Sequence, residues 1–170
     1  FDLEFLQVPA EALVASMQDH QKFFPVVATD SGQLQARFIA VANLDSEDFN
    51  AVRQGFERVI RPRLADARFF WEQDNKTPLG DRLTQLNSIV FQKTLGSVGD
   101  KSARIKNISK KLAEFTGVDE VASSRAALLS KCDLVSHMVG EFPELQGIMG
   151  QYYAMESGET AVVSQAIGEH

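Results

Sequence analysis

The stretch from Ala126 to Ala154, which decides the class of fold, reads AALLSKCDLVSHMVGEFPELQGIMGQYYA. Its apolar residues recur three and four positions apart, as they do on one face of a helix. The spacing predicts a long helix from Ala126 through Leu129 to Val139. Because proline is well accepted in the first turn of a helix, a second helix is expected from near Pro143 to about Ala154.

The segments on either side of this stretch carry the same helical signal. A last helix is expected after Gly158. Upstream, Asp100 is expected to open a helix that ends at Gly117, because glycine readily takes the left-handed conformation that closes a helix. The apolar residues at helical spacing between them, which predict a buried stripe, are Ile105, Ile108, Leu112 and Phe115.

Residues 46 to 90 are also interpreted as helical. Ser46 is the expected N-cap of the first helix, since its hydroxyl can accept a backbone N–H. Proline cannot continue the hydrogen-bond ladder, so an interruption is expected near Pro62, with a second helix from about Arg63. Pro78 is expected to open a third helix, whose apolar stripe continues to Val90.

The first forty-odd residues are different, because β-type patterns appear in them. Phe5 to Val8 is a strand candidate, and residues 10 to 20 carry helical spacing. Two β-rich runs, 25–28 and 34–43, flank a Gly-containing polar turn and predict a hairpin. Alternation along the second run places Ile39 and Val41 on the face opposite Phe38, so we expect this strand to be covered on both sides.

The predicted fold class is therefore α+β and mostly helical. A small α/β lobe with a β-hairpin, residues 1–45, precedes an all-helical lobe, residues 46–170. No low-complexity tract or repeat is visible.

Charge is unevenly distributed along the chain. The formal net charge is −6, yet residues 53 to 111 hold 13 of the 17 Lys and Arg and 6 of the 23 acids. A basic middle between acidic flanks is typical of a face turned toward phosphate. Helix faces whose charges pair across the fold would give the same pattern.

Signatures of catalysis and cofactor binding are absent from the sequence. There is neither a Walker loop nor a dinucleotide-binding fingerprint, and His20, His137 and His170 are too far apart for zinc spacing. The single cysteine, Cys132, cannot form an internal disulfide and is interpreted as a small core residue. No apolar run approaches the roughly 20 residues of a membrane helix. Because the chain begins with Phe1 rather than Met, we interpret it as a piece of a longer protein.

Several segments resemble the beta subunit of bacterial glycyl-tRNA synthetase. Their order and spacing fit that family and together cover nearly the whole chain, and the thirteen-residue run that ends at Gly150 is the most specific. The segments are His20–Val26, Arg61–Phe70, Val90–Gly96, Lys131–Val135, Met138–Gly150 and Tyr152–Ala154. The chain is thus identified as an internal fragment of a member of this family.

The resemblance implies the function. In such an enzyme the alpha subunit carries the class II catalytic site and binds glycine, ATP and Mg²⁺, and the beta subunit supplies most contacts to glycine tRNA. The expected assembly is a cytoplasmic heterotetramer of two alpha and two beta chains. The fragment is therefore expected to hold no catalytic residue and no cofactor, to be inactive alone, and to act through tRNA binding and contacts with the alpha subunit.

The resemblance also implies that the helical lobe is similar to HD domains. Metal-dependent HD phosphohydrolases carry a His-Asp pair after a run like Ala126–Leu129, and here that pair is replaced by Ser130 and Lys131. An ammonium group repels a divalent cation. We therefore expect a degenerate HD-like lobe without a metal.

Two groups of basic residues are the candidate RNA contacts, because Lys and Arg neutralise phosphates and release counterions. They are Arg61, Arg63 and Arg68, and Lys101, Arg104, Lys106, Lys110 and Lys111. Intramolecular ion pairs are the competing interpretation, and nearby Asp66 favours it for the first group. Aromatic residues that could stack on a base are interpreted as core: Phe23, Phe24, Phe69, Phe70 and Trp71.

Two other functions remain open from the sequence. One is an active metal-dependent HD-type phosphohydrolase. The other is a purely structural scaffold that holds the alpha subunit without touching RNA.

Overall fold

The computed structural model describes residues 1–43, 45 and 47–170, without the side chain of His20. Its contacts divide the chain into two compact units, Phe1–Glu72 and Gln73–His170. Ser46, the predicted N-cap, lies outside the described residues. The predicted division into two lobes at residue 45 stays a prediction. The boundary between the two compact units falls later in the sequence, between Glu72 and Gln73.

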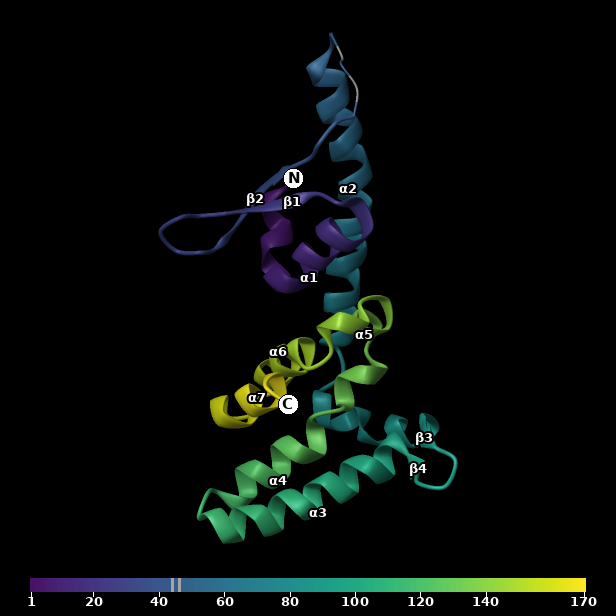
Figure 1. Cartoon of the computed structure of the whole chain (residues 1–170), viewed down its shortest axis with the longest axis vertical. Helices are drawn as coiled ribbons and strands as arrows, with labels where there is room; N and C mark the ends of the chain where they lie inside the picture. The colour runs from purple at the N-terminus through teal and green to yellow at the C-terminus, as the bar shows by residue number, and fades with distance from the viewer. Residues whose placement is uncertain (44, 46) are drawn as a thin grey trace. The chain divides into compact units, whose positions relative to one another are not determined.

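The first unit combines short helices with a β-hairpin (Figure 1). Its elements are η1 (Leu3–Gln7), α1 (Ala10–Ala15), η2 (Ser16–His20), β1 (Phe24–Val27), β2 (Leu34–Ile39) and all but the end of α2 (Phe49–Asp74). The strands are antiparallel, with Phe24 opposite Ile39, which confirms the predicted hairpin.

The strand predicted at Phe5 to Val8 is wrong. The segment is the 3₁₀ turn η1, and both Phe5 and Val8 are buried. In a 3₁₀ turn, residues three apart lie on the same side, whereas a strand would place them on opposite faces. Burial of both side chains therefore favours the turn.

The interruption predicted near Pro62 is also wrong. Helix α2, which is 26 residues long, continues through this proline. Proline removes only its own N–H from the ladder. On either side of it, Ile60, Leu64 and Ala67 are fully buried and hold the helix in place.

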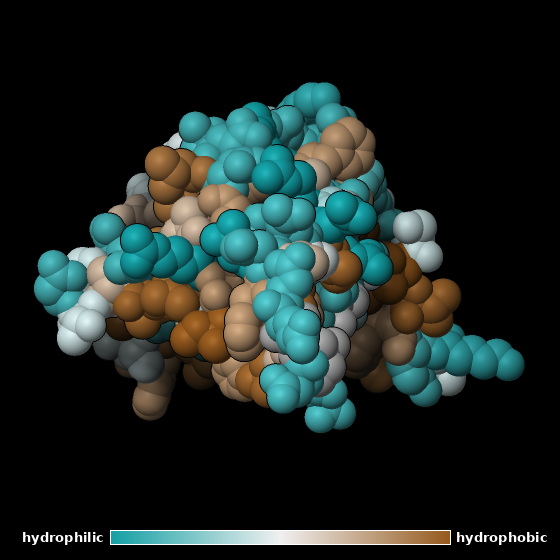
Figure 2. Space-filling model, turned by 90° about the horizontal axis from the view of Figure 1, so that it is seen from above, coloured by the Kyte–Doolittle hydropathy of each residue, from teal (hydrophilic) through white to brown (hydrophobic). Residues whose placement is uncertain are grey.

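Aromatic rings form the centre of the first unit. Phe23 stacks on Phe38, with ring centroids 4.9 Å apart, and meets Phe56 edge-on at 5.4 Å. On the opposite face, Ile39 of β2 is exposed, as is Val41, which lies beyond the end of the strand. The prediction that both faces of this strand are covered is therefore wrong for the described residues. Exposed apolar residues also occur elsewhere on the surface, and Figure 2 shows several in brown among hydrophilic ones.

The second unit is built of short helices and one small hairpin (Figure 1). Its elements are η3 (Leu79–Ser88), β3 (Val90–Gln92), β4 (Gly96–Ser97), α3 (Val98–Thr116), α4 (Glu120–Leu129), η4 (Cys132–Val135), α5 (His137–Glu141), η5 (Pro143–Leu145), α6 (Ile148–Glu156) and α7 (Ala161–Gly168). With both units described, the fold class is α+β and mostly helical, as predicted.

Helix α3 has the ends that the sequence indicates. Ser97 and Asp100 form a reciprocal capping box, in which each side chain accepts the other's backbone N–H. Gly117 closes the helix with φ of 75°. The only difference is that the helix begins at Val98, two residues before the predicted start.

The long helix predicted from Ala126 to Val139 is wrong, since it is divided into α4, η4 and α5. Asp133 explains the break. Its Oδ2 accepts the backbone N–H groups of Gly147 at 2.6 Å and Gly150 at 3.1 Å, at the start of α6. Satisfying these free donors at a helix N-terminus requires the chain to turn inward after α4.

Two further helices are shorter than predicted. The helix expected from Pro143 is divided into η5 and α6, because Gly147 has φ of 85°, which an α-helix cannot contain. The stripe expected from Pro78 to Val90 ends with η3, and Val90 lies in β3, opposite Ser97 of β4.

Candidate nucleic-acid interface

The arginines of α2 lie on the first unit, and two of the three candidates are held by acids. Arg61 is 2.8 Å from Asp2, and Arg68 is 2.9 Å from Glu4 and 2.7 Å from Glu72. These pairs support the interpretation that their charges are used within the fold. The third candidate, Arg63, is exposed and makes no ion pair with the described residues.

The basic residues of α3 lie on the second unit and are arranged differently. Lys110 is 2.8 Å from Glu120 of α4, and this pair raises the pKa of Lys110 through the hydrogen bond and charge of Glu120. No ion pair within 4 Å joins the other four to any described acid: Lys101, Arg104, Lys106 and Lys111. Four of the five α3 candidates are therefore without an ion pair among the described residues, although the charge of Arg104 helps to lower the pKa of Asp100.

The buried stripe predicted on α3 is wrong. Ile108 and Leu112 are each 57% exposed, and Phe115 is 90% exposed. The face that packs toward α4 carries small residues instead. Ser102 and Ala113 are buried, and the Ser109 hydroxyl donates to the carbonyl of Ser123 in α4.

This second stripe could have been found in the sequence. Ser102, Ser109 and Ala113 repeat at helical spacing, with the half-buried Ile105 between them. Small side chains let two helices approach closely, and α3 and α4 pack along their length (Figure 1). Hydrophobicity alone favoured the wrong face, because it gives no weight to serine.

A residue that the sequence reasoning missed lies beside the α3 cations. Phe91 of β3 is exposed, and the Lys101 ammonium lies 4.2 Å from the centroid of its ring. This distance is within the range of a cation–π interaction. Phe91 was overlooked because the segment was interpreted as helix, although the Gly96 that permits the hairpin is visible in the sequence.

The aromatic residues interpreted as core divide into two groups. Phe23 is buried, as predicted. Phe24 and Phe69 are exposed, so the prediction is wrong for both. Phe70 and Trp71 are half-buried, and the ring of Phe70 meets that of Phe69 at 6.0 Å.

A buried polar cluster occupies the core of the second unit. The Asp74 carboxylate accepts the Tyr153 hydroxyl at 2.7 Å and the backbone N–H groups of His137 and Met138, and it lies 3.6 Å from Arg82. Arg82 in turn stacks 5.0 Å from the Tyr153 ring centroid. Burial raises the pKa of Tyr153, so this hydroxyl stays protonated. The cluster ties the end of α2 to η3, α5 and α6.

Cys132 and Asp133 are also enclosed. Burial raises the pKa of the Cys132 thiol to about 12, which confirms a core residue rather than an activated nucleophile. Burial likewise raises the pKa of Asp133, against the two N–H groups that stabilise its charge. Both side chains serve packing and hydrogen bonding inside the unit.

Neither a metal site nor a membrane span is found in the described part of the chain. Among the described residues, no group of three or more His, Cys, Asp or Glu could hold a metal ion. Within the same residues, no helix is long and apolar enough to cross a membrane. The predicted lack of a metal or other cofactor stays a prediction.

Comparison with known proteins gives the family. The family model of the glycyl-tRNA synthetase beta subunit matches residues 1–170. The glycine–tRNA ligase beta subunit of Marinobacter nauticus is 53% identical over 169 residues, which cover 99% of this chain and 24% of that protein. Those of Acinetobacter baylyi and Dichelobacter nodosus are each 50% identical over the same shares. The chain thus spans about a quarter of the length of these relatives, and it belongs to the glycyl-tRNA synthetase beta subunit family.

Proposed function

We propose that this chain is a non-catalytic part of a glycyl-tRNA synthetase beta subunit, which supports attachment of glycine to its tRNA by binding the tRNA. The observation that carries the proposal is the set of α3 cations without an acid partner among the described residues: Lys101, Arg104, Lys106 and Lys111. Such cations attract phosphate, and each phosphate that they neutralise releases counterions. Arg63 is a weaker candidate on the first unit.

Charge reversal on α3 tests this proposal in the complete alpha–beta enzyme. The variant carries Lys106→Glu, Lys110→Glu and Lys111→Glu. We expect weaker tRNA binding and a slope of log K against log salt that is shallower by roughly 0.7 to 0.9 for each phosphate that is no longer neutralised. If affinity and slope both stay at the wild-type value, α3 is a solvated face and the proposal fails.

The rest of the enzyme is proposed from the family alone. The alpha subunit would carry the class II catalytic site with ATP and Mg²⁺, in a cytoplasmic assembly of two alpha and two beta chains. This chain by itself is then expected to show no glycine-dependent pyrophosphate exchange. Measurable exchange by the purified 170-residue chain would contradict this part of the proposal.

Contact with the alpha subunit is a second candidate role, and the exposed apolar end of α3 and α4 favours it. The exposed residues there are Ile108, Leu112, Phe115, Val118 and Val121. Exposed apolar side chains in a cluster are typical of protein interfaces. Leu112→Ser in the complete enzyme would weaken subunit association if this end meets the alpha chain, whereas tRNA affinity would be retained.

An active HD-type phosphohydrolase finds no support in the second unit. At the position where that family has the Asp of its His-Asp pair stands Lys131, which is half-buried. Elemental analysis of protein purified without chelator is expected to find no stoichiometric Mn, Fe or Zn. A bound ion with phosphodiesterase activity would instead establish the hydrolase.

A further inference from the structure

The β3–β4 hairpin is held in shape without a hydrophobic core. All three residues of β3 are exposed. The Gln92 side-chain oxygen accepts the Thr94 N–H at 2.7 Å, the Thr94 hydroxyl at 2.6 Å and the Leu95 N–H at 3.0 Å. The turn is therefore fixed by its own hydrogen bonds, and it presents apolar side chains to solvent instead of burying them.

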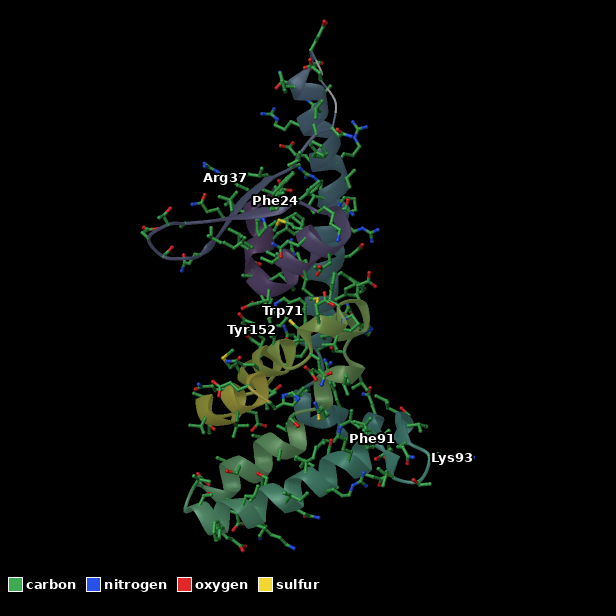
Figure 3. The ribbon with its side chains drawn as sticks, in the orientation of Figure 1. Phe24, Arg37, Trp71, Phe91, Lys93 and Tyr152 are labelled. Atoms are coloured by element: carbon green, nitrogen blue, oxygen red, sulfur yellow. The ribbon has the colours of Figure 1, made fainter. Side chains whose placement is uncertain are left out.

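One aromatic ring on this hairpin lies against a lysine of α3. Phe91 is 41% exposed, and the Lys101 ammonium lies 4.2 Å from its ring centroid. Figure 3 shows Phe91 beside the start of α3 and Lys93 at the outer turn of the same hairpin. An exposed ring with a cation over one face combines the two elements of a site for single-stranded nucleic acid.

A second lysine lies within electrostatic range of the first. Lys131, just after α4, is half-buried, and burial together with the charge of Lys101 lowers its pKa. Its ammonium lies 2.7 Å from Nε2 of His170, whose Nδ1 is bonded to the Ile167 carbonyl. If Nδ1 donates that proton, Nε2 accepts one from Lys131, which leaves two of the three ammonium protons for another partner.

Asp133 and Asp100, the acids beside this pair, accept backbone N–H groups. Asp133 opposes the lowering of the Lys131 pKa, and its Oδ2 accepts the N–H groups of Gly147 and Gly150, while its buried Oδ1 has no hydrogen-bond partner among the described residues. Asp100, one residue from Lys101, is held in the capping box by Ser97. Two ammonium groups of like charge, without an ion pair to any described acid, favour an anion from outside the chain.

We propose that Phe91, Lys101 and Lys131 form a binding site for one unpaired nucleotide of tRNA. The base stacks on the exposed part of the Phe91 ring, and the adjoining phosphate lies between the two ammonium groups. Stacking requires an unpaired base, because a base inside a duplex is covered on both faces. The site rests on the proposed tRNA-binding function and places one element of that function at the hairpin.

Four single variants of the complete alpha–beta enzyme test the site, with tRNA binding measured over a range of salt concentrations. Phe91→Ala should weaken binding by roughly 5- to 150-fold, as expected for loss of one stacked base, and should leave the salt slope unchanged. Lys101→Gln and Lys131→Gln should each lower the slope by roughly 0.7 to 0.9. Phe91→Trp should retain the affinity, since a larger ring still stacks.

An exposed ring outside the proposed sites supplies the matched control. Phe49→Ala removes an equally large and more exposed ring of α2, and we expect unchanged tRNA affinity. In every variant, glycine-dependent pyrophosphate exchange and subunit association are measured as well. If Phe91→Ala impairs association of the subunits and leaves tRNA affinity intact, the hairpin binds protein and the nucleotide site is wrong.

The two proposals fail separately. If charge reversal at Lys106, Lys110 and Lys111 weakens tRNA binding but Phe91→Ala and Lys131→Gln do not, the chain binds tRNA and the nucleotide site is refuted. If none of these variants alters tRNA affinity, the tRNA-binding function fails together with the site.

Discussion

The arginines of α2 and the lysines of α3 look alike in the sequence but differ in the fold. On α2, Arg61 and Arg68 reach Asp2 and Glu4, which lie about sixty residues earlier in the chain. On α3, only Lys110 has an acid partner among the described residues. The difference shows that the density of basic residues does not identify an RNA surface until the internal pairs are subtracted.

A third kind of basic residue extends the comparison. Arg82 belongs to the same basic segment, yet it is buried with Asp74 in the core of the second unit. The segment from 53 to 111 therefore contains buried, paired and unpaired cations, and each kind should respond differently to substitution.

The largest effect is expected from Arg82→Met. The change leaves the Asp74 carboxylate buried without its cation, although Tyr153 and two backbone N–H groups still bind it. We expect the free energy of unfolding to fall by about 3 kcal/mol, at the lower end of the range for broken buried pairs. Urea unfolding measures the loss, and alkylation of Cys132 reports opening of this unit, since burial holds its thiol pKa at about 12. If the free energy of unfolding falls by less than about 1 kcal/mol, the Arg82–Asp74 pair contributes no more than an exposed ion pair does.

A smaller effect is expected from freeing a paired lysine. Glu120→Gln removes the acid held by Lys110, so that Lys110 joins the unpaired cations of α3. In the complete enzyme, the salt slope of tRNA binding should become steeper by up to roughly 0.7 to 0.9, with a higher affinity at low salt. The control is Glu114→Gln, which removes an acid of α3 that makes no ion pair within 4 Å among the described residues and acts on Lys110 less strongly than Glu120 does. Equal gains in the two variants would mean that only net charge matters.

A still smaller effect is expected on α2. Arg61→Gln and Arg68→Gln break exposed ion pairs, which contribute about 0 to 1 kcal/mol each. Thermal or urea unfolding should show that small loss of stability, and tRNA affinity should stay at the wild-type value. A fall in tRNA affinity with an altered salt slope would show that RNA displaces Asp2 and Glu4, and the two helices would then belong to one class.

The smallest effect on stability is expected from Phe115→Ser. Truncation of a buried phenylalanine lowers the free energy of unfolding by about 3 to 5 kcal/mol, whereas truncation of an exposed one changes it by about 0.5 kcal/mol or less. Because Phe115 is 90% exposed, the second outcome is expected in urea unfolding of the 170-residue chain. If the free energy of unfolding falls by several kcal/mol instead, Phe115 is buried, as the hydrophobic stripe predicted.

Structural features that depend on local interactions could be predicted from the sequence. The capping box of Ser97 and Asp100, the closing Gly117 and the hairpin around residues 28–34 each depend on residues a few positions apart. The family followed from short segments that resemble sequences of the glycyl-tRNA synthetase beta subunit, and such segments can be recognised without the fold. Cys132 could be assigned to the core from the apolar pattern around it. Phe23 was assigned only from the general tendency of aromatic residues to be buried, which fails for Phe24.

Only the tertiary structure decided which faces are buried and which charges are used. Asp133 breaks a helical pattern to bind N–H groups fourteen and seventeen residues away, and Arg61 pairs with an acid 59 residues away. On α3, serine and alanine face α4 while larger apolar residues face solvent. Burial and ion pairing depend on partners brought together by the whole fold, and the spacing of residues along one helix carries no information about those partners.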